Sequence, residues 1–185
     1  MNLVYEQDNF LSSDECDFLI SYYIEHKEKN HKSTELYTDS HGLSSNVMWI
    51  HRTNPFNLKK TLLFNRITKN ISKRLSLKLN FFQVVHWPTN SYELGHYGGN
   101  DLNDNGTVNQ WACVCYLNDN YTGGDTILGT ELKHIPPKKG KMIIFEGQKI
   151  FHGISLVTSG DRFNLMSWWR SDQPKLTTET NGLTY

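Results

Sequence analysis

Residues 92 to 162 carry the most informative pattern of the chain, and they begin with Tyr92-Glu-Leu-Gly-His96-Tyr-Gly98. Further groups follow in this order: Tyr116-Leu-Asn118, Gly123-Gly-Asp-Thr126, Pro137-Lys-Lys-Gly140, His152-Gly153 and finally Arg162. A neutral imidazole offers one ring nitrogen to a divalent metal ion, and a guanidinium grips a carboxylate through two parallel hydrogen bonds. His96, His152 and Arg162 therefore predict a metal held by two imidazoles, with a carboxylate-bearing small molecule beside it.

Short strands are predicted around this stretch. From residue 80 the side chains alternate with the period of two that is typical of strands, and turn residues separate the runs. The predicted strands cover residues 80–87, 111–117, 131–135, 141–145, 149–152 and 162–169.

Side chains two apart on a strand point to the same face. By this rule His96 projects together with residue 98 and, if the strand is regular, with Tyr92 and Leu94. A second shared face is predicted for Arg162, Asn164, Met166 and Trp168. If Arg162 and Tyr116 point into a barrel, the residues that pack outward under the helices are Trp111, Cys113, Cys115 and Leu117.

Two helices are predicted before the strands. Ser12 and Glu15 have the spacing of a capping box, and an apolar stripe then recurs at helical spacing through Cys16, Leu19, Ile20 and Tyr23. The stripe of the second helix consists of Leu63, Ile67, Ile71 and Leu75, with Lys59, Lys60 and Lys69 on other faces. A short strand near residues 47–50 and a turn at Asn54-Pro55 are expected between the helices. Helices followed by short strands predict an α+β fold with a sandwich or barrel.

Length and composition narrow the class of protein. The 185 residues predict one domain, with a mainly helical cover over 1–79, a catalytic barrel over 80–170 and a polar tail over 171–185. Lys+Arg and Asp+Glu number 19 each, so no net charge favours nucleic acid or a membrane surface as partner. No apolar run approaches the ~20 residues of a membrane helix. The absence of a signal-peptide pattern and the three cysteines indicate reduced thiols in a cytoplasmic protein.

The order of these motifs resembles that of the Fe(II)/2-oxoglutarate-dependent oxygenases, most closely the prolyl 4-hydroxylase-like branch. The resemblance covers roughly residues 80–170. It implies a double-stranded β-helix, which is a jelly-roll or cupin-like barrel, with N-terminal cover helices. It also implies Fe(II), 2-oxoglutarate and O2 as cofactors. His96 and His152 match the iron ligands, Arg162 the residue that binds the far carboxylate of 2-oxoglutarate, and Tyr116 a tyrosine that assists it.

Gly98 departs from the pattern, because it stands where the family carries the aspartate of a His-X-Asp motif. A glycine leaves one position on the metal without a side-chain ligand. Relatives with alanine or glycine there are iron/2-oxoglutarate halogenases, in which chloride or bromide takes that position. The resemblance therefore implies functionalisation of an aliphatic C–H bond through a ferryl intermediate, with radical halogenation as the first interpretation.

Other interpretations of Gly98 stay open. In one of them, the resemblance implies a prolyl 4-hydroxylase-like dioxygenase that carries a glycine there, naturally or as an Asp-to-Gly variant. Alternatively, Asp101 supplies the carboxylate by way of the flexible Gly98-Gly99 pair, although its parity would require a bulge. A third interpretation is a binding module without oxygen chemistry.

The expected substrate is a small molecule or a peptidyl residue, with an amino-acid-like group favoured. Loops 36–56 and 99–110 are long and polar, and we expect them to select the substrate at the mouth of the barrel. The sequence leaves open a free amino acid, a peptidyl residue and a nucleoside-like molecule.

Overall fold

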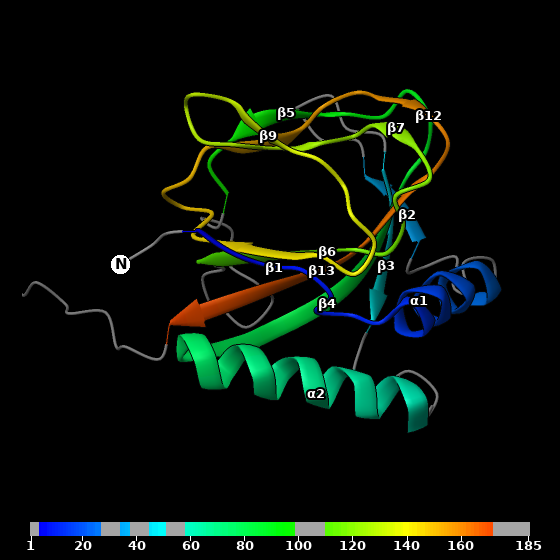
Figure 1. Ribbon diagram of the computed structural model, residues 1–185, viewed down its shortest axis with the longest axis vertical. Coiled ribbons are helices and arrows are strands. Elements are labelled where there is room, and N and C mark those ends of the chain that lie inside the picture. The colour runs from blue at the N-terminus through cyan, green and yellow to red at the C-terminus, as the bar shows by residue number, and fades with distance from the viewer. Residues whose placement is uncertain (1–3, 27–33, 38–44, 51–57, 99–109, 172–185) are drawn as a thin grey trace, which may run out of the picture.

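A computed structural model describes residues 4–26, 34–37, 45–50, 58–98 and 110–171. Two antiparallel β-sheets face each other, and helices α1 (Ser13–His26) and α2 (Leu58–Leu75) lie on the outer side of the larger sheet (Figure 1). This is the predicted α+β architecture, a double-stranded β-helix with cover helices.

The larger sheet has seven strands in the order β1-β10-β6-β13-β4-β3-β2. Their bounds are β1 Val4–Gln7, β2 Thr34–Tyr37, β3 Ser45–Ile50, β4 Leu77–Trp87, β6 Trp111–Tyr116, β10 Met142–Phe145 and β13 Arg162–Ser171. The smaller sheet has the order β5-β11-β8-β9, with bounds Glu93–His96, His152–Ile154, Thr126–Leu128 and Lys133–Ile135. A separate pair joins β7 (Thr122–Gly123) to β12 (Val157–Ser159).

The structure confirms most of the predicted strands and corrects one. The strand expected over 149–152 is wrong, because the backbone N–H groups of Lys149 and Ile150 both donate to the Glu146 carbonyl, at 3.0 and 2.9 Å. These bonds close a turn, and β11 begins only at His152. The region 1–79, expected to be mainly helical, also contributes β1, β2, β3 and the start of β4 to the larger sheet. The turn expected at 54–55 lies outside the described residues.

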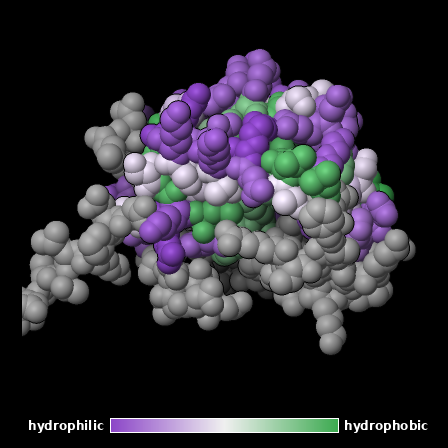
Figure 2. Space-filling model, turned by 90° about the horizontal axis from the view of Figure 1, so that it is seen from below, coloured by the Kyte–Doolittle hydropathy of each residue, from purple (hydrophilic) through white to green (hydrophobic). Residues whose placement is uncertain are grey.

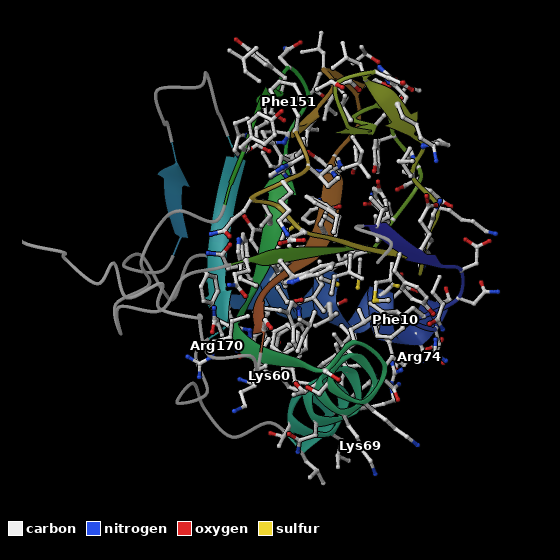
Figure 3. All side chains as sticks on the ribbon, turned by 90° about the vertical axis from the view of Figure 1, so that its left-hand side faces the viewer. Phe10, Lys60, Lys69, Arg74, Phe151 and Arg170 are labelled. Atoms are coloured by element: carbon white, nitrogen blue, oxygen red, sulfur yellow. The ribbon has the colours of Figure 1, made fainter. Side chains whose placement is uncertain are left out.

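Both helices form where their apolar spacing predicts them. The Glu15 N–H donates to Ser12 Oγ at 3.2 Å and the Ser12 N–H donates to Glu15 Oε2 at 2.9 Å, which confirms the capping box. The buried stripes include Cys16, Leu19, Tyr23, Leu63, Ile67 and Ile71. Lys60 differs from the prediction: it is buried, and its Nζ donates to the Tyr22 hydroxyl at 3.2 Å (labelled in Figure 3).

Strand β6 separates two layers of the core, as its parity predicts. Cys113, Cys115 and Leu117 pack with the helices, and the cysteines are free thiols. The alternate residues pack toward the smaller sheet, against Leu128 and Ile135, and they are Ala112, Val114 and Tyr116. Seen from below, the outer surface of the molecule carries hydrophilic side chains with small hydrophobic patches between them (Figure 2). Within the described ranges, neither helix has the length and apolar character needed to cross a membrane.

Candidate active site

The pairing of β5 with β11 brings the two predicted metal ligands together. His96 lies opposite His152, and the ring centroids are 4.4 Å apart. His96 Nδ1 lies 3.2 Å from the Leu94 carbonyl oxygen, and His152 Nδ1 lies 2.8 Å from that of Ile150. A carbonyl only accepts hydrogen bonds, so each Nδ1 carries a proton, and in the neutral form of each ring Nε2 keeps its lone pair. Both rings are thus held in the form that binds a metal through Nε2.

Burial sets the protonation state of one ring. It lowers the pKa of His152 to about 4, an effect that the Ile150 carbonyl opposes and the neighbouring His96 adds to. His152 is therefore neutral at physiological pH, which is the state that a metal requires.

Gly98 lies directly beside both imidazoles. A Cβ placed on Gly98 would lie 3.3 Å from His152 Nε2 and 3.6 Å from His96 Nε2. Its backbone N–H donates to the Gly147 carbonyl at 3.0 Å. Gly98 is not among the glycines with positive φ, so the backbone does not require a glycine here. Residue 98 therefore faces the space between the two Nε2 atoms without offering a ligand, while Asp101 lies outside the described residues.

A β-bulge changes which residues of β5 face inward. Ile154 pairs with Glu93, and His152 pairs with His96, so two steps along β11 match three steps along β5. Residues that are directly opposite in a sheet share a face, and His152 and Ile154 share one because they are two apart. Glu93 therefore lies on the same face as His96, although the two residues are three apart.

The bulge overturns the parity expected for a regular strand. Leu94 is 54% exposed and Tyr92 is 37% exposed, so neither points inward with His96 as predicted. The side chain of Glu93 is only 19% exposed, and its Oε1 lies 3.8 Å from His96 Nε2.

The guanidinium of Arg162 occupies a buried pocket at the start of β13. Arg162 is fully buried, and its Cζ lies 5.6 Å from the centroids of both the Trp87 and the Tyr116 rings. Its Nη2 donates to Thr126 Oγ1 at 3.4 Å. With its amide oxygen turned toward the guanidinium, Asn164 accepts from Nη1 at 2.7 Å and from Nη2 at 3.1 Å. In the described part of the chain no carboxylate forms an ion pair with Arg162. Its buried positive charge is therefore not balanced by an acidic side chain there, which is energetically unfavourable.

Further polar groups surround this guanidinium. The Tyr116 hydroxyl lies 2.5 Å from Thr126 Oγ1, and burial raises the pKa of Tyr116, so the phenol stays protonated. Arg162 Nε, Trp87 Nε1 and the Tyr121 hydroxyl are buried without a hydrogen-bond partner among the described residues. A Cβ on Gly124 would touch Arg162 Cδ at 3.0 Å and the Tyr121 ring at 3.1 Å, so those two side chains are neighbours. Buried donors that lack an acceptor indicate an anion-binding pocket.

The register of the smaller sheet relates this pocket to the histidines. In the pairing of β8 with β11, Leu128 lies opposite His152 and Thr126 lies opposite Ile154. Thr126, which contacts Arg162, is therefore two residues along the same inner face from the histidine row, or about 7 Å. A short dicarboxylate fits this separation, with one end at the guanidinium and the other near the imidazoles. The described residues contain no group of three His, Cys, Asp or Glu side chains arranged to hold a metal.

Of the predicted site residues, His96, His152 and Gly98 lie together, and Arg162 and Tyr116 share one pocket. Sequence reasoning missed five functional candidates: Glu93, Thr126, Tyr121, Trp87 and Asn164. Glu93 and Thr126 depend on strand register, which the sequence does not show. Asn164 had a usable signal, because it shares strand parity with Arg162.

Comparison with known proteins identifies the class. The sequence profile of the 2OG-Fe(II) oxygenase superfamily matches residues 78–170, and the chain belongs to this family. A comparison with curated protein sequences finds no match.

Solved structures of prolyl hydroxylases share its fold. The viral collagen prolyl hydroxylase of Paramecium Bursaria Chlorella virus-1, in complex with 2OG, superposes with a TM-score of 0.70 at 21% identity over 92% of this chain and 97% of that chain. A Pseudomonas putida prolyl-4-hydroxylase gives a TM-score of 0.68 at 16% identity, over 92% and 94%. A prolyl hydroxylase in complex with a hypoxia inducible factor peptide fragment, from Trichoplax adhaerens, gives 0.69 at 17% identity, over 91% and 84%. At these identities the likeness establishes the double-stranded β-helix fold.

Family membership implies Fe(II), 2-oxoglutarate and O2, and the described residues fit these groups. Two Nε2 lone pairs face the same space, and a buried guanidinium lacks an acid partner among the described residues. The metal has matching nitrogen donors, and one carboxylate of 2-oxoglutarate has a matching cation.

Proposed function

We propose that the chain hydroxylates an aliphatic C–H bond of an amino-acid-like substrate. In this proposal His96 and His152 hold Fe(II) through Nε2, and Arg162 with Tyr116 binds 2-oxoglutarate. The observation that carries the proposal is the fully buried Arg162, which has no acid partner in the described part of the chain and lies beside the face that carries both imidazoles. When bound, Fe(II) and 2-oxoglutarate supply the activation of O2 that oxidises the C–H bond.

The residues of the chain position and shield the reactants. Arg162 would hold the far carboxylate of 2-oxoglutarate by paired hydrogen bonds, and that carboxylate would balance its buried charge. Thr126 and the protonated hydroxyl of Tyr116 lie next to the guanidinium and would line the site of that carboxylate. Apolar side chains such as Trp87 and Ile154 keep water from the pocket, and the ion pair is stronger in this low-dielectric surrounding.

A peptidyl substrate is the favoured form of the amino-acid-like group. The fold is shared over more than nine tenths of the chain with a collagen prolyl hydroxylase and with a prolyl hydroxylase in complex with a peptide fragment. These neighbours support hydroxylation ahead of halogenation, and a peptide ahead of a free amino acid.

Halogenation is the second candidate, and Gly98 is the observation that favours it. A side chain at residue 98 would begin within 3.6 Å of both Nε2 atoms, and glycine supplies none. Chloride or bromide then has room beside the metal on that side.

The discriminating experiment is anaerobic reconstitution with Fe(II), 2-oxoglutarate and chloride, followed by exposure to O2. Succinate is quantified, and mass spectrometry follows a panel of proline-containing peptides and free amino acids. A product with one added oxygen supports hydroxylation, and a product with the isotope pattern of chlorine supports halogenation. Absence of both succinate and measurable 2-oxoglutarate binding would contradict both candidates and favour a binding module.

The Gly98→Asp variant tests the second candidate directly. The new carboxylate would occupy the position beside both Nε2 atoms, at the cost of a shift of a few tenths of an ångström by His152, whose ring lies 3.2 Å from the added Cβ. If the wild type halogenates, we expect Gly98→Asp to suppress the halogenated product and to permit the hydroxylated one. A product ratio untouched by the change would show that residue 98 does not face the metal.

A further inference from the structure

We propose that Glu93 supplies the metal-binding carboxylate that Gly98 lacks. The inference rests on the proposed iron site at His96 and His152. Glu93 Oε1 lies 3.8 Å from His96 Nε2, the atom that would bind the metal. The Glu93 side chain is only 19% exposed and lies on the same face of β5 as His96.

Close packing around β5 stabilises its bulge. The inward position of Glu93 therefore follows from the backbone and not from one side-chain rotamer. A Cβ on Gly153 would lie 2.8 Å from the Glu93 carbonyl oxygen and 3.0 Å from the Gly95 nitrogen, which no real side chain tolerates without displacement. A Cβ on Gly95 would overlap the ring of Phe151. Two glycines thus let β11 and the Phe151 ring approach β5, where the extra residue turns Glu93 inward.

As they stand, Glu93, His96 and His152 do not form a three-ligand metal group, but the length of the glutamate side chain suits the role. Two ligands of one ion at about 2.1 Å lie about 3 Å apart when their bonds to it meet at a right angle. Glu93 Oε1 therefore has to move by about 1 Å relative to His96 Nε2, which rotation about its side-chain bonds provides. Glutamate is also one methylene longer than aspartate, which suits a ligand that starts from a neighbouring row of the sheet.

The consequence is a site with two histidines and one carboxylate, with the carboxylate before the first histidine in sequence. A carboxylate from Glu93 would leave no metal position for halide to fill in place of a missing protein ligand. This inference therefore deepens the hydroxylation proposal and opposes the second candidate.

The test uses Co(II) binding to the apo protein, which needs no turnover. We expect Glu93→Gln, nearly identical in shape, to weaken Co(II) binding by about tenfold or more in calorimetric titration. The matched control is Glu131→Gln, an exposed glutamate two residues before β9, and we expect this variant to bind Co(II) like the wild type. Thermal unfolding checks that both variants fold.

Chloride gives a second readout through the visible spectrum of the Co(II) protein, which reports its ligands. We expect chloride to leave the wild-type spectrum unchanged and to alter that of Glu93→Gln. Adding Gly98→Asp to Glu93→Gln should restore both the affinity and the insensitivity to chloride.

Equal Co(II) affinity in wild type and Glu93→Gln would overturn the inference, and so would a wild-type spectrum that responds to chloride. The iron site itself is tested separately, because His96→Ala and His152→Ala should each abolish Co(II) binding whatever Glu93 does. If those variants still bind Co(II) at wild-type affinity, the proposed function fails and not only the role of Glu93.

Discussion

The buried charge of Arg162 limits the kind of ligand that its pocket can bind. Its guanidinium is fully buried, and in the described part of the chain the groups that accept from it are neutral: the Thr126 hydroxyl and the Asn164 amide. A buried charge with only neutral partners costs folding free energy, and a bound carboxylate removes that cost. Because no acid in the described part of the chain pairs with Arg162, its charge is suited to bind a carboxylate ligand and not to hold the fold together by an ion pair.

Replacing Arg162 by Gln should therefore separate binding from stability. We expect Arg162→Gln to weaken 2-oxoglutarate binding to the metal-loaded protein by about 100-fold, because a buried charge pair contributes roughly 3 kcal/mol. The melting temperature of the apo protein should not fall, since an unpaired buried charge is removed. Calorimetry with 2-oxoglutarate and a thermal melt measure the two effects.

Arg170→Gln is the control, because Arg170 lies at the opposite end of β13 and is partly exposed (Figure 3). It should bind 2-oxoglutarate like the wild type. Unchanged affinity in Arg162→Gln, or a large loss of apo stability without a loss of binding, would assign Arg162 a structural role.

At the scale of elements, the pairing of β5 with β11 builds the metal-facing surface. His96 and Glu93 face inward together only because of the bulge, and the bulge requires the close approach of Gly153 to the β5 backbone.

We expect Gly153→Ala to lower the free energy of unfolding by about 1–3 kcal/mol, because the new methyl group would overlap the backbone of β5. Co(II) affinity should fall with it as the two strands move apart. Gly147→Ala is the matched control, because outside its chain neighbours the nearest heavy atom to its Cβ would be His152 Cε1, in ordinary contact at 3.5 Å. Chemical denaturation and metal titration measure both effects. A Gly153→Ala protein as stable and as metal-binding as Gly147→Ala would show that the bulge does not organise the site.

Helix α1 is joined to the site-bearing strand β6 through a buried thiol. Cys16 Sγ donates to the Tyr116 carbonyl oxygen at 3.8 Å, and burial raises the pKa of Cys16 from 9.0 to about 11. Between these two values the unfolded chain releases a proton that the folded chain keeps. Stability from this thiol is thus complete below pH 9 and is lost as the pH rises toward 11.

The expected result is a steeper loss of stability in alkali for the wild type than for Cys16→Ala. The difference in slope should be about 1.4 kcal/mol per pH unit between the two pKa values, measured by urea unfolding at a series of pH values. Cys113 and Cys115 are present in both proteins and cancel in the comparison. Parallel curves would show that Cys16 is not buried as a neutral thiol.

For the whole molecule, the sequence predicted what depends on local periodicity. The helix stripes and the two faces of β6 follow from spacing alone, and the order of motifs indicates His96, His152 and Arg162 as site residues. Their roles as metal and 2-oxoglutarate ligands stay predictions, as does the division of the chain into cover, barrel and tail.

What the sequence could not supply is register between distant strands. The inward position of Glu93 depends on one extra residue in β5, and the contact of Thr126 with Arg162 depends on two sheets meeting face to face. The wrong prediction for the start of β11 has a similar cause. Backbone hydrogen bonds to the Glu146 carbonyl close a turn before β11, and residue types alone do not predict such bonds.

The most direct test of the proposed site is a crystal structure of the protein grown anaerobically with Mn(II) and 2-oxoglutarate, with the metal located by anomalous diffraction. We predict a single metal within about 2.3 Å of Nε2 of both His96 and His152, with the far carboxylate of 2-oxoglutarate paired to Arg162. A metal bound elsewhere, or an Arg162 paired to a carboxylate of the chain itself, would contradict the proposal.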